Sequence, residues 1–123
     1  MVEARALEGT RILVIEDDYY LATDEAAILQ GAGSAIVGCT GKVEESHRLI
    51  RSEAIDCALV DINLGEGPTF EIARTLLERQ VPFLFTTGYD AQTIPPEFAH
   101  VGRLEKPVDA NKLVAAVKAL LVR

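Results

Sequence analysis

The chain has 123 residues, 49% of them hydrophobic and 25% charged, which is the size and composition of one globular domain. Its formal net charge of −7 argues against a nucleic-acid partner, which needs a basic face. No apolar run approaches the roughly 20 residues of a membrane-spanning helix, and the start of the chain lacks the apolar stretch of a signal peptide. We therefore expect a cytoplasmic protein. Its two cysteines are too few for a zinc site or a disulfide framework.

Short apolar runs predict the strands of a parallel sheet. In chain order they are residues 11–15, 35–37, 58–60 and 83–85, with a weaker fifth run at Leu104. These runs are apolar on both faces, as in strands that are buried between two layers of helices. Residues 1–9 precede the first run, and we expect them to form a flexible lead before a single domain over residues 10–123.

The segments between these runs change to helical spacing, in which apolar residues recur every three or four positions. The last segment shows this most clearly, with Leu113, Val114, Val117, Leu120 and Leu121 on one face. Asp109 is its expected N-cap. The segment after the fourth run differs, because Pro95 and Pro96 lie where a fourth helix is expected. Proline removes a backbone donor and restricts the residue before it, so we predict that this helix is absent or reduced to a turn.

Strands that alternate with helices indicate a parallel sheet with right-handed crossovers, whose ligands bind beyond the carboxyl ends of the strands. Polar residues follow four of the predicted strands at this point. They are Glu16, Asp17 and Asp18 after the first, Asp61 after the third, Thr86 and Thr87 at the fourth, and Glu105 and Lys106 at the fifth. Asp18 is interpreted as the N-cap of the first helix, and the others are expected to meet at one edge of the sheet.

These residue types favour a divalent cation and a phosphoryl group. Clustered carboxylates repel one another unless a cation or a proton offsets their charge. A ligand set made only of oxygen atoms favours Mg²⁺, Mn²⁺ or Ca²⁺ over zinc, and Mg²⁺ also binds phosphate oxygens. An aspartate can attack phosphorus to form an aspartyl phosphate, while a lysine and a threonine hydroxyl stabilise the phosphoryl oxygens.

At this point the sequence resembles the receiver domains of two-component response regulators over about residues 10–122. The matching pieces are ILVIED at 12–17, LVDINL at 59–64, FTTG at 85–88 and LEKP at 104–107. The resemblance implies a flavodoxin-like α/β fold with five βα units, and a five-stranded parallel sheet in the order 2-1-3-4-5. It also implies that the protein is a phosphoacceptor and not an enzyme with a separate substrate, because only its own phosphorylation and dephosphorylation are catalysed.

The resemblance assigns roles to residues of the predicted edge. Asp61 matches the phosphoacceptor and, with Glu16, Asp17 and the backbone carbonyl of Asn63, the Mg²⁺ ligands of the family. Asp17 would contact the metal directly, and Glu16 through water.

The resemblance also implies partners for the phosphoryl group. Thr87, which precedes Gly88, matches the hydroxyl that bonds a phosphoryl oxygen. Lys106 matches the lysine that pairs first with the acceptor and then with the phosphate, and its bond to Pro107 is expected to be cis.

Two features depart from the family pattern. Receivers usually carry an aromatic switch residue three positions before the lysine, but Arg103 stands there in this chain. The string VPFLFTTGY at 81–89 resembles an alphaproteobacterial subgroup with a Phe-Ala-Thr-Gly-x-Tyr-like motif, with Thr86 in place of alanine. Tyr89 and Arg103 are therefore candidates for the signalling role.

The expected function is a stand-alone receiver that takes its phosphoryl group from a histidine kinase or a histidine phosphotransfer protein. It would signal through a protein target or pass the phosphate on, and phosphorylation-linked homodimers are a further expectation. Two alternatives stay open. One is a receiver-like interaction module that takes no phosphate. Arg103, in place of the usual aromatic residue, leaves this alternative open. The other is an aspartate-nucleophile phosphatase, although Asn63 occupies the position where such enzymes carry a second acid.

Overall fold

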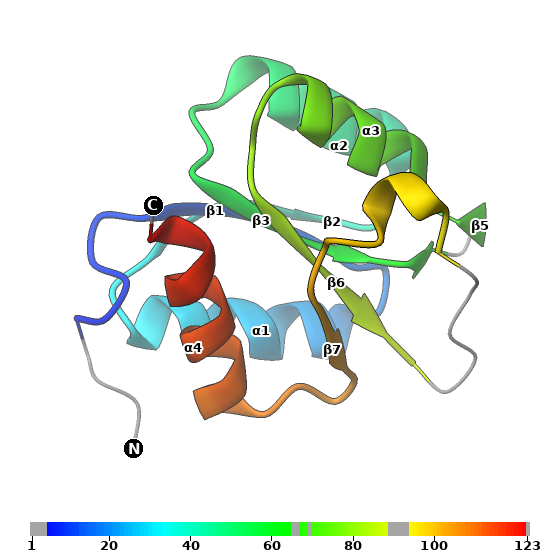
Figure 1. Ribbon diagram of the computed structural model, residues 1–123. Helices are drawn as coiled ribbons and strands as arrows, with labels where there is room; N and C mark the ends of the chain where they lie inside the picture. Colours follow the sequence, from blue (N-terminus) through cyan, green and yellow to red (C-terminus); the bar gives the residue numbers. More distant parts are fainter. Residues whose placement is uncertain (1–4, 65–66, 69, 89–93, 123) are drawn as a thin grey trace.

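The computed structural model describes residues 5–64, 67–68, 70–88 and 94–122. Within these ranges, no helix combines the length and the apolar character that crossing a bilayer requires. The fold is a three-layer α/β arrangement in which one sheet lies between two pairs of helices (Figure 1).

The central sheet has five parallel strands in the order β2-β1-β3-β6-β7. They are β1 (Arg11–Ile15), β2 (Ala35–Thr40), β3 (Cys57–Asp61), β6 (Phe83–Thr87) and β7 (Arg103–Glu105). Numbered as main strands in chain order, this is the predicted order 2-1-3-4-5, so the expected flavodoxin-like fold is confirmed. Two short strands, β4 (Asn63–Leu64) and β5 (Gly67–Pro68), form a separate antiparallel pair that the sequence did not indicate.

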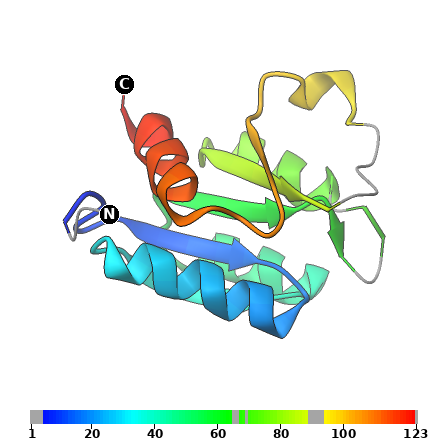
Figure 2. The same cartoon turned by 90° about the horizontal axis from the view of Figure 1, so that it is seen from below.

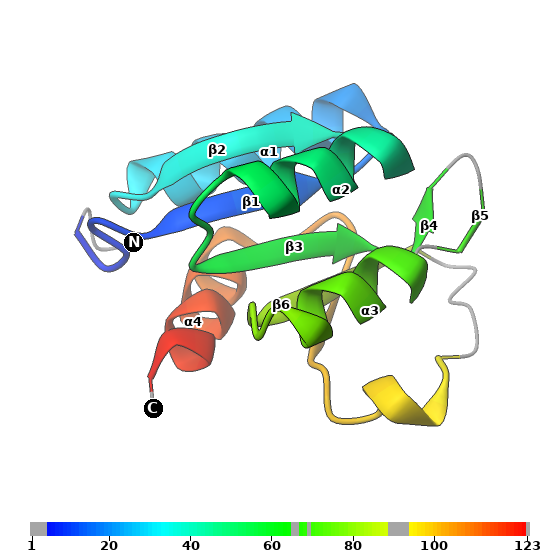
Figure 3. The same cartoon turned by 90° about the horizontal axis from the view of Figure 1, so that it is seen from above.

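Helices cover both faces of the sheet. α1 (Tyr19–Gly31) and α4 (Ala110–Leu121) lie on one face (Figures 1 and 2), and α2 (Val43–Ser52) and α3 (Phe70–Glu78) lie on the other (Figure 3). Each face has its own apolar cluster. Because it is packed from both sides, β3 is buried at all five positions, as its uninterrupted apolar run predicted.

Both predicted helix caps are present. The Asp18 carboxylate accepts hydrogen bonds from the backbone N–H groups of Tyr20 and Leu21, and Asp109 accepts one from Lys112. Such caps satisfy donors that a helix leaves unpaired in its first turn. The cap at Asp18 starts α1 only a few residues after β1 ends, so Asp17 stays at the carboxyl edge of the sheet.

The predicted reduction of the fourth helix is confirmed. Between β6 and β7 the described residues contain only a single 3₁₀ turn, η1 (Pro96–Phe98). The Phe98 side chain is fully buried, and its ring packs against the three other phenylalanine rings of the chain, Phe70, Phe83 and Phe85. One aromatic side chain therefore fills space on this face that an amphipathic helix would otherwise cover.

The packed domain begins nearer to the N-terminus than the sequence indicated. Residues 5–9 form a turn, and Leu7 is 2% exposed within the apolar cluster on the α1 and α4 face. Its backbone N–H donates to the carbonyl of Ala32 over 2.8 Å. The packed unit thus reaches Leu7, whereas the sequence suggested a start at residue 10.

Candidate functional site

Three charged side chains meet at the carboxyl edge of the sheet. Asp61 ends β3, Glu16 follows β1, and Lys106 follows β7. The Lys106 ammonium lies 3.1 Å from Asp61 Oδ2 and 3.1 Å from Glu16 Oε1. Both carboxylates are buried, while the lysine is partly exposed. The structure therefore joins residues that stand 45 and 90 positions apart in the chain.

The strand register explains this meeting. Ile15 of β1 lies beside Val60 of β3, so the next residues, Glu16 and Asp61, leave the sheet together. On the other side Thr87 pairs with Glu105, and the backbone N–H of Lys106 donates to the Thr87 carbonyl over 2.7 Å. The Lys106–Pro107 peptide is cis, as expected.

Electrostatics at this edge favour an added positive charge. Burial, together with the nearby charge of Asp61, raises the pKa of Glu16 to about 7, although hydrogen bonds from the Asp18 backbone and from Lys106 oppose the rise. Burial alone would lower the pKa of Lys106, but its hydrogen bonds with Asp61 and Glu16, together with the negative charges of these two carboxylates, outweigh burial and raise it. Two buried carboxylates thus share one ammonium group.

The acidic residues also suit a hard divalent cation. Carboxylate oxygens of Glu16, Asp17 and Asp61 lie within 4.8 Å of one another. Asp17 is exposed, so the cluster opens to solvent on one side. Asn63 is close in the chain, and its backbone N–H donates to Asp61 Oδ1 over 3.1 Å. An all-oxygen set that is open to water fits Mg²⁺, which keeps several water ligands.

Gly41, which sequence reasoning missed, supports the position of Asp17. A Cβ atom at Gly41 would lie 2.5 Å from the Cα of Asp17, a distance that real Cβ atoms do not adopt. The loop after β2 can therefore approach the acidic cluster only because this residue has no side chain. The sequence did contain a signal for this close approach, because a glycine directly follows the second strand at the edge where the acidic residues gather.

The two threonines at the end of β6 lie in different positions. Thr86 stands beside Asp61 in the register, and its buried hydroxyl has no hydrogen-bond partner among the described residues. Thr87 lies one residue further, at the level of Glu105 and next to the backbone of Lys106.

The two candidate signalling residues are not part of this cluster. Tyr89 lies outside the described residues. Arg103 is exposed on β7 and forms no ion pair with another residue that the structure describes.

A second buried acid was also missed. Glu25 on α1 is 1% exposed, and neither of its carboxylate oxygens has a hydrogen-bond partner within the described ranges. Burial, followed by the negative charge of Glu16, raises the pKa of Glu25 to about 8, so the side chain is mostly neutral at pH 7. Its spacing from Leu21 and Leu29 placed it on the apolar face of the helix, which was the available signal.

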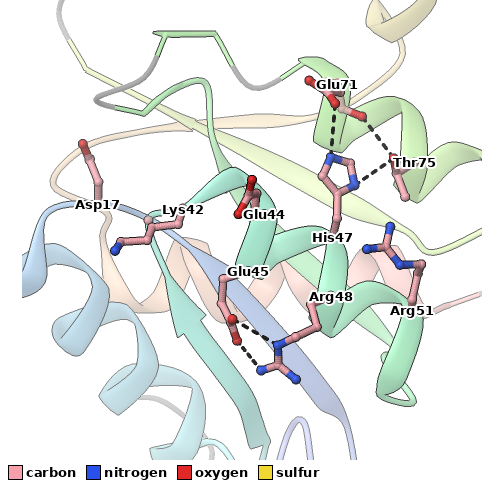
Figure 4. A pocket seen from close by; sticks show the side chains of 10 residues that line it. Asp17, Lys42, Glu44, Glu45, His47, Arg48, Arg51, Glu71 and Thr75 are labelled. Carbon is pink, nitrogen blue, oxygen red and sulfur yellow. Dashed lines mark hydrogen bonds and ion pairs between the residues drawn. The ribbon is translucent and has the colours of Figure 1, made fainter.

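A polar groove of about 1080 Å³ begins at Asp17 and follows α2 toward α3 (Figure 4). At its far end the Nδ1 atom of His47 lies 3.2 Å from the Thr75 hydroxyl oxygen, and Nε2 lies 3.6 Å from a carboxylate oxygen of Glu71. His47 thereby connects the two helices. Both acidic and basic side chains line the groove, so its charge does not favour one sign of ligand.

Comparisons with known proteins agree with this geometry. The family model described as the response regulator receiver domain matches residues 12–118. The sensor protein TorS of Escherichia coli is 32% identical over 75% of this chain, and the match spans 10% of TorS. The phyllosphere-induced regulator PhyR of Methylorubrum extorquens is 30% identical over 77% of this chain, and the match spans 37% of PhyR. The chain thus matches only part of these relatives.

Solved structures show the same fold. SdrG from Sphingomonas melonis Fr1 is 30% identical to this chain. The two structures superpose with a TM-score of 0.82, and the match covers 95% of this chain and 98% of SdrG. SdrG in its BeF₃-activated conformation is 29% identical, with a TM-score of 0.79 over 94% of this chain and 98% of that one.

Proposed function

The chain belongs to the response regulator receiver domain family of two-component signalling, and from this we propose that Asp61 accepts a phosphoryl group from a protein histidine. The donor would be a sensor histidine kinase or a histidine phosphotransfer protein. The observation that carries the proposal is the buried Asp61 carboxylate, which lies 3.1 Å from the Lys106 ammonium and beside Glu16 and Asp17.

The transfer is a displacement at phosphorus. A carboxylate oxygen of Asp61 forms the new P–O bond while the P–N bond of the phosphohistidine breaks, and the histidine nitrogen keeps the electron pair of that bond. Glu16, Asp17, Asp61 and the Asn63 carbonyl would hold Mg²⁺, which when bound neutralises charge on the phosphoryl oxygens.

Lys106 supplies a positive charge before the phosphoryl group arrives. Its ammonium already contacts the acceptor and is kept protonated by both buried carboxylates. After transfer it would contact a phosphoryl oxygen, and the Thr87 hydroxyl would donate a hydrogen bond to another. Because the Lys106 backbone bonds to the Thr87 carbonyl, a shift of either residue would displace the other.

The proposed output is a change in protein contacts on the β6 and β7 side of the sheet, or passage of the phosphoryl group to another protein. Arg103 stands on that side, three residues before Lys106. SdrG has a BeF₃-activated conformation, and this supports our proposal that the present chain also changes conformation on activation.

Phosphorylation can be tested with acetyl phosphate and Mg²⁺. We expect intact-mass spectrometry to show one added phosphate on the wild type and none on Asp61→Asn. Lys106→Met should slow phosphorylation by about 10²-fold, because it removes a charge aimed at the transferring group. Lys112→Met, which changes an exposed lysine of α4, is the matched control and should react like the wild type.

The outcomes separate this proposal from its alternatives. If neither acetyl phosphate nor purified histidine kinases phosphorylate Asp61, the chain is an interaction module that takes no phosphate. Rapid turnover of a small phosphate ester would instead indicate a phosphatase. Equal rates for Lys106→Met and the wild type would remove the role proposed for Lys106.

Mg²⁺ binding has its own test. Metal that binds only the folded state stabilises it by about 2.7 kcal/mol at a hundredfold excess over its dissociation constant. We expect Mg²⁺ to raise the melting temperature of the wild type, and Asp17→Asn to abolish most of this rise because it removes the exposed ligand of the cluster. An equal rise in both proteins would place the metal elsewhere.

A further inference from the structure

The outer edge of β7 is open for pairing within the described part of the fold. β7 is the last strand in the sheet order and pairs only with β6. Strands with an open edge present unpaired backbone groups, and such edges commonly bind another strand. The arrangement of charge on this edge indicates which strand it fits.

The backbone of β7 alternates between its two sides. The Gly102 carbonyl accepts from Phe85, and the Lys106 N–H donates to Thr87, so the even-numbered positions face β6. In a parallel strand the positions between them direct their N–H and C=O groups away from that neighbour. Arg103 and Glu105 therefore present two donors and two acceptors on the outer edge.

The side chains of Arg103 and Glu105 lie on the same face of the sheet. Leu104 packs against the apolar cluster on the α1 and α4 face, so its two neighbours point to the opposite face. Both are exposed, and neither forms an ion pair with another described residue. The edge thus carries one positive and one negative side chain, two positions apart and free to meet partners.

We propose that two copies of this chain associate by antiparallel pairing of their β7 edges about a twofold axis at Leu104. This register places Arg103 of each copy opposite Glu105 of the other. It forms four backbone hydrogen bonds and two cross-strand ion pairs, which is the self-complementary contact that a twofold dimer requires. Parallel pairing in register would instead place like charges opposite each other, which is unfavourable.

The dimer is weak and reversible. The paired segment is only three residues long, and the net charge of −7 on each copy opposes association. We expect a dissociation constant of about 0.1–1 mM, the range of small transient contacts. Pairing does not require phosphate, so Asp61→Asn should associate like the wild type, and failure of the phosphorylation proposal would leave this one standing.

Charge exchange tests the register. Arg103→Glu and Glu105→Arg should each weaken self-association about tenfold in sedimentation equilibrium, because each places like charges opposite each other at both pairs. An equimolar mixture of the two variants should associate as strongly as the wild type, since every pair is then of opposite sign. The double variant Arg103→Glu with Glu105→Arg should also recover.

The control is Lys112→Glu, which makes the same change in net charge as Arg103→Glu but at an exposed position of α4. It should associate like the wild type, and equal weakening by this variant would show that net charge alone is responsible. A wild type that stays fully monomeric at about 1 mM, the upper end of the expected range of dissociation constants, overturns the proposal. So does a mixture of the two single variants that does not recover.

Discussion

Two crossovers on opposite faces of the sheet differ in how regular their backbone is and in how well their buried side chains are packed. The first, from β1 to β2, uses the 13-residue helix α1 with an Asp18 cap, yet it buries Glu25 with no hydrogen-bond partner in the described structure. In the crossover from β6 to β7, the described residues contain only the three-residue turn η1, yet its Phe98 is fully buried among three other aromatic rings.

The difference shows that regular backbone and complete packing are separate properties. In α1 every turn is helical, but one position on the buried face is a carboxylic acid, and burial without partners is unfavourable. In the described part of the β6–β7 crossover, only three residues form a helical turn, but the buried Phe98 side chain is apolar and packs against other aromatic rings. Stability should therefore depend more on the anchor Phe98 than on helical content, and the following changes test that view.

The largest expected effect is that of Phe98→Ala. It removes a fully buried ring and leaves a cavity, which typically lowers the free energy of unfolding by about 3–5 kcal/mol. Urea unfolding monitored by circular dichroism would measure the loss. Leu77→Ala is the control, because Leu77 is 37% exposed on α3 and should cost far less. Similar losses for the two variants would remove Phe98 as the anchor of the crossover.

Glu25→Leu should stabilise the protein at alkaline pH. The pKa of Glu25 is raised to about 8 in the folded chain, from 4.5 in the unfolded chain. Between these values the folded state holds a proton that the unfolded state has lost, so the stability that Glu25 contributes is full below pH 4.5 and is lost as pH rises through 8. The leucine variant lacks this loss, so its advantage should grow between these pH values by about 3–5 kcal/mol and stay constant at higher pH.

Melting temperatures of both proteins from pH 5 to pH 9 would show the effect as a difference that grows with pH. Asp24→Leu is the matched control, because Asp24 is exposed on the same helix next to Glu25. A constant difference between Glu25→Leu and the wild type across this range would mean that Glu25 stays ionised or finds a partner.

Arg74→Ala should have the smallest effect. Arg74 connects α3 to η1, because its guanidinium lies 2.8 Å from a Glu97 carboxylate oxygen and 5.8 Å from the centre of the Phe98 ring. Both charged side chains are about half exposed, so solvent screens the pair and the loss should be below about 1 kcal/mol. A double-mutant cycle with Glu97→Ala would isolate the pair. A coupling above that limit would mean that the ion pair is screened less than its exposure implies.

The sequence predicted much of this fold because its signals are local. Apolar runs located the five main strands, and Asp18 and Asp109 indicated two helix starts that the structure confirms. Pro95 and Pro96 predicted the reduced fourth helix, since proline acts on its own backbone and on the residue before it. The β4–β5 pair was missed because its strands have only two residues each, too few for a period to show.

By itself, the sequence determined which residues gather at the candidate site. The carboxyl ends of parallel strands share one edge, so Glu16, Asp61 and Lys106 had to lie near one another once the strands were assigned. Only the tertiary structure decided how they interact there. The sharing of Lys106 by two buried carboxylates and the contact of Gly41 with Asp17 depend on side-chain packing between distant segments. Periodicity gives the face on which a residue lies, but not what it meets there, as the buried and unpartnered Glu25 illustrates.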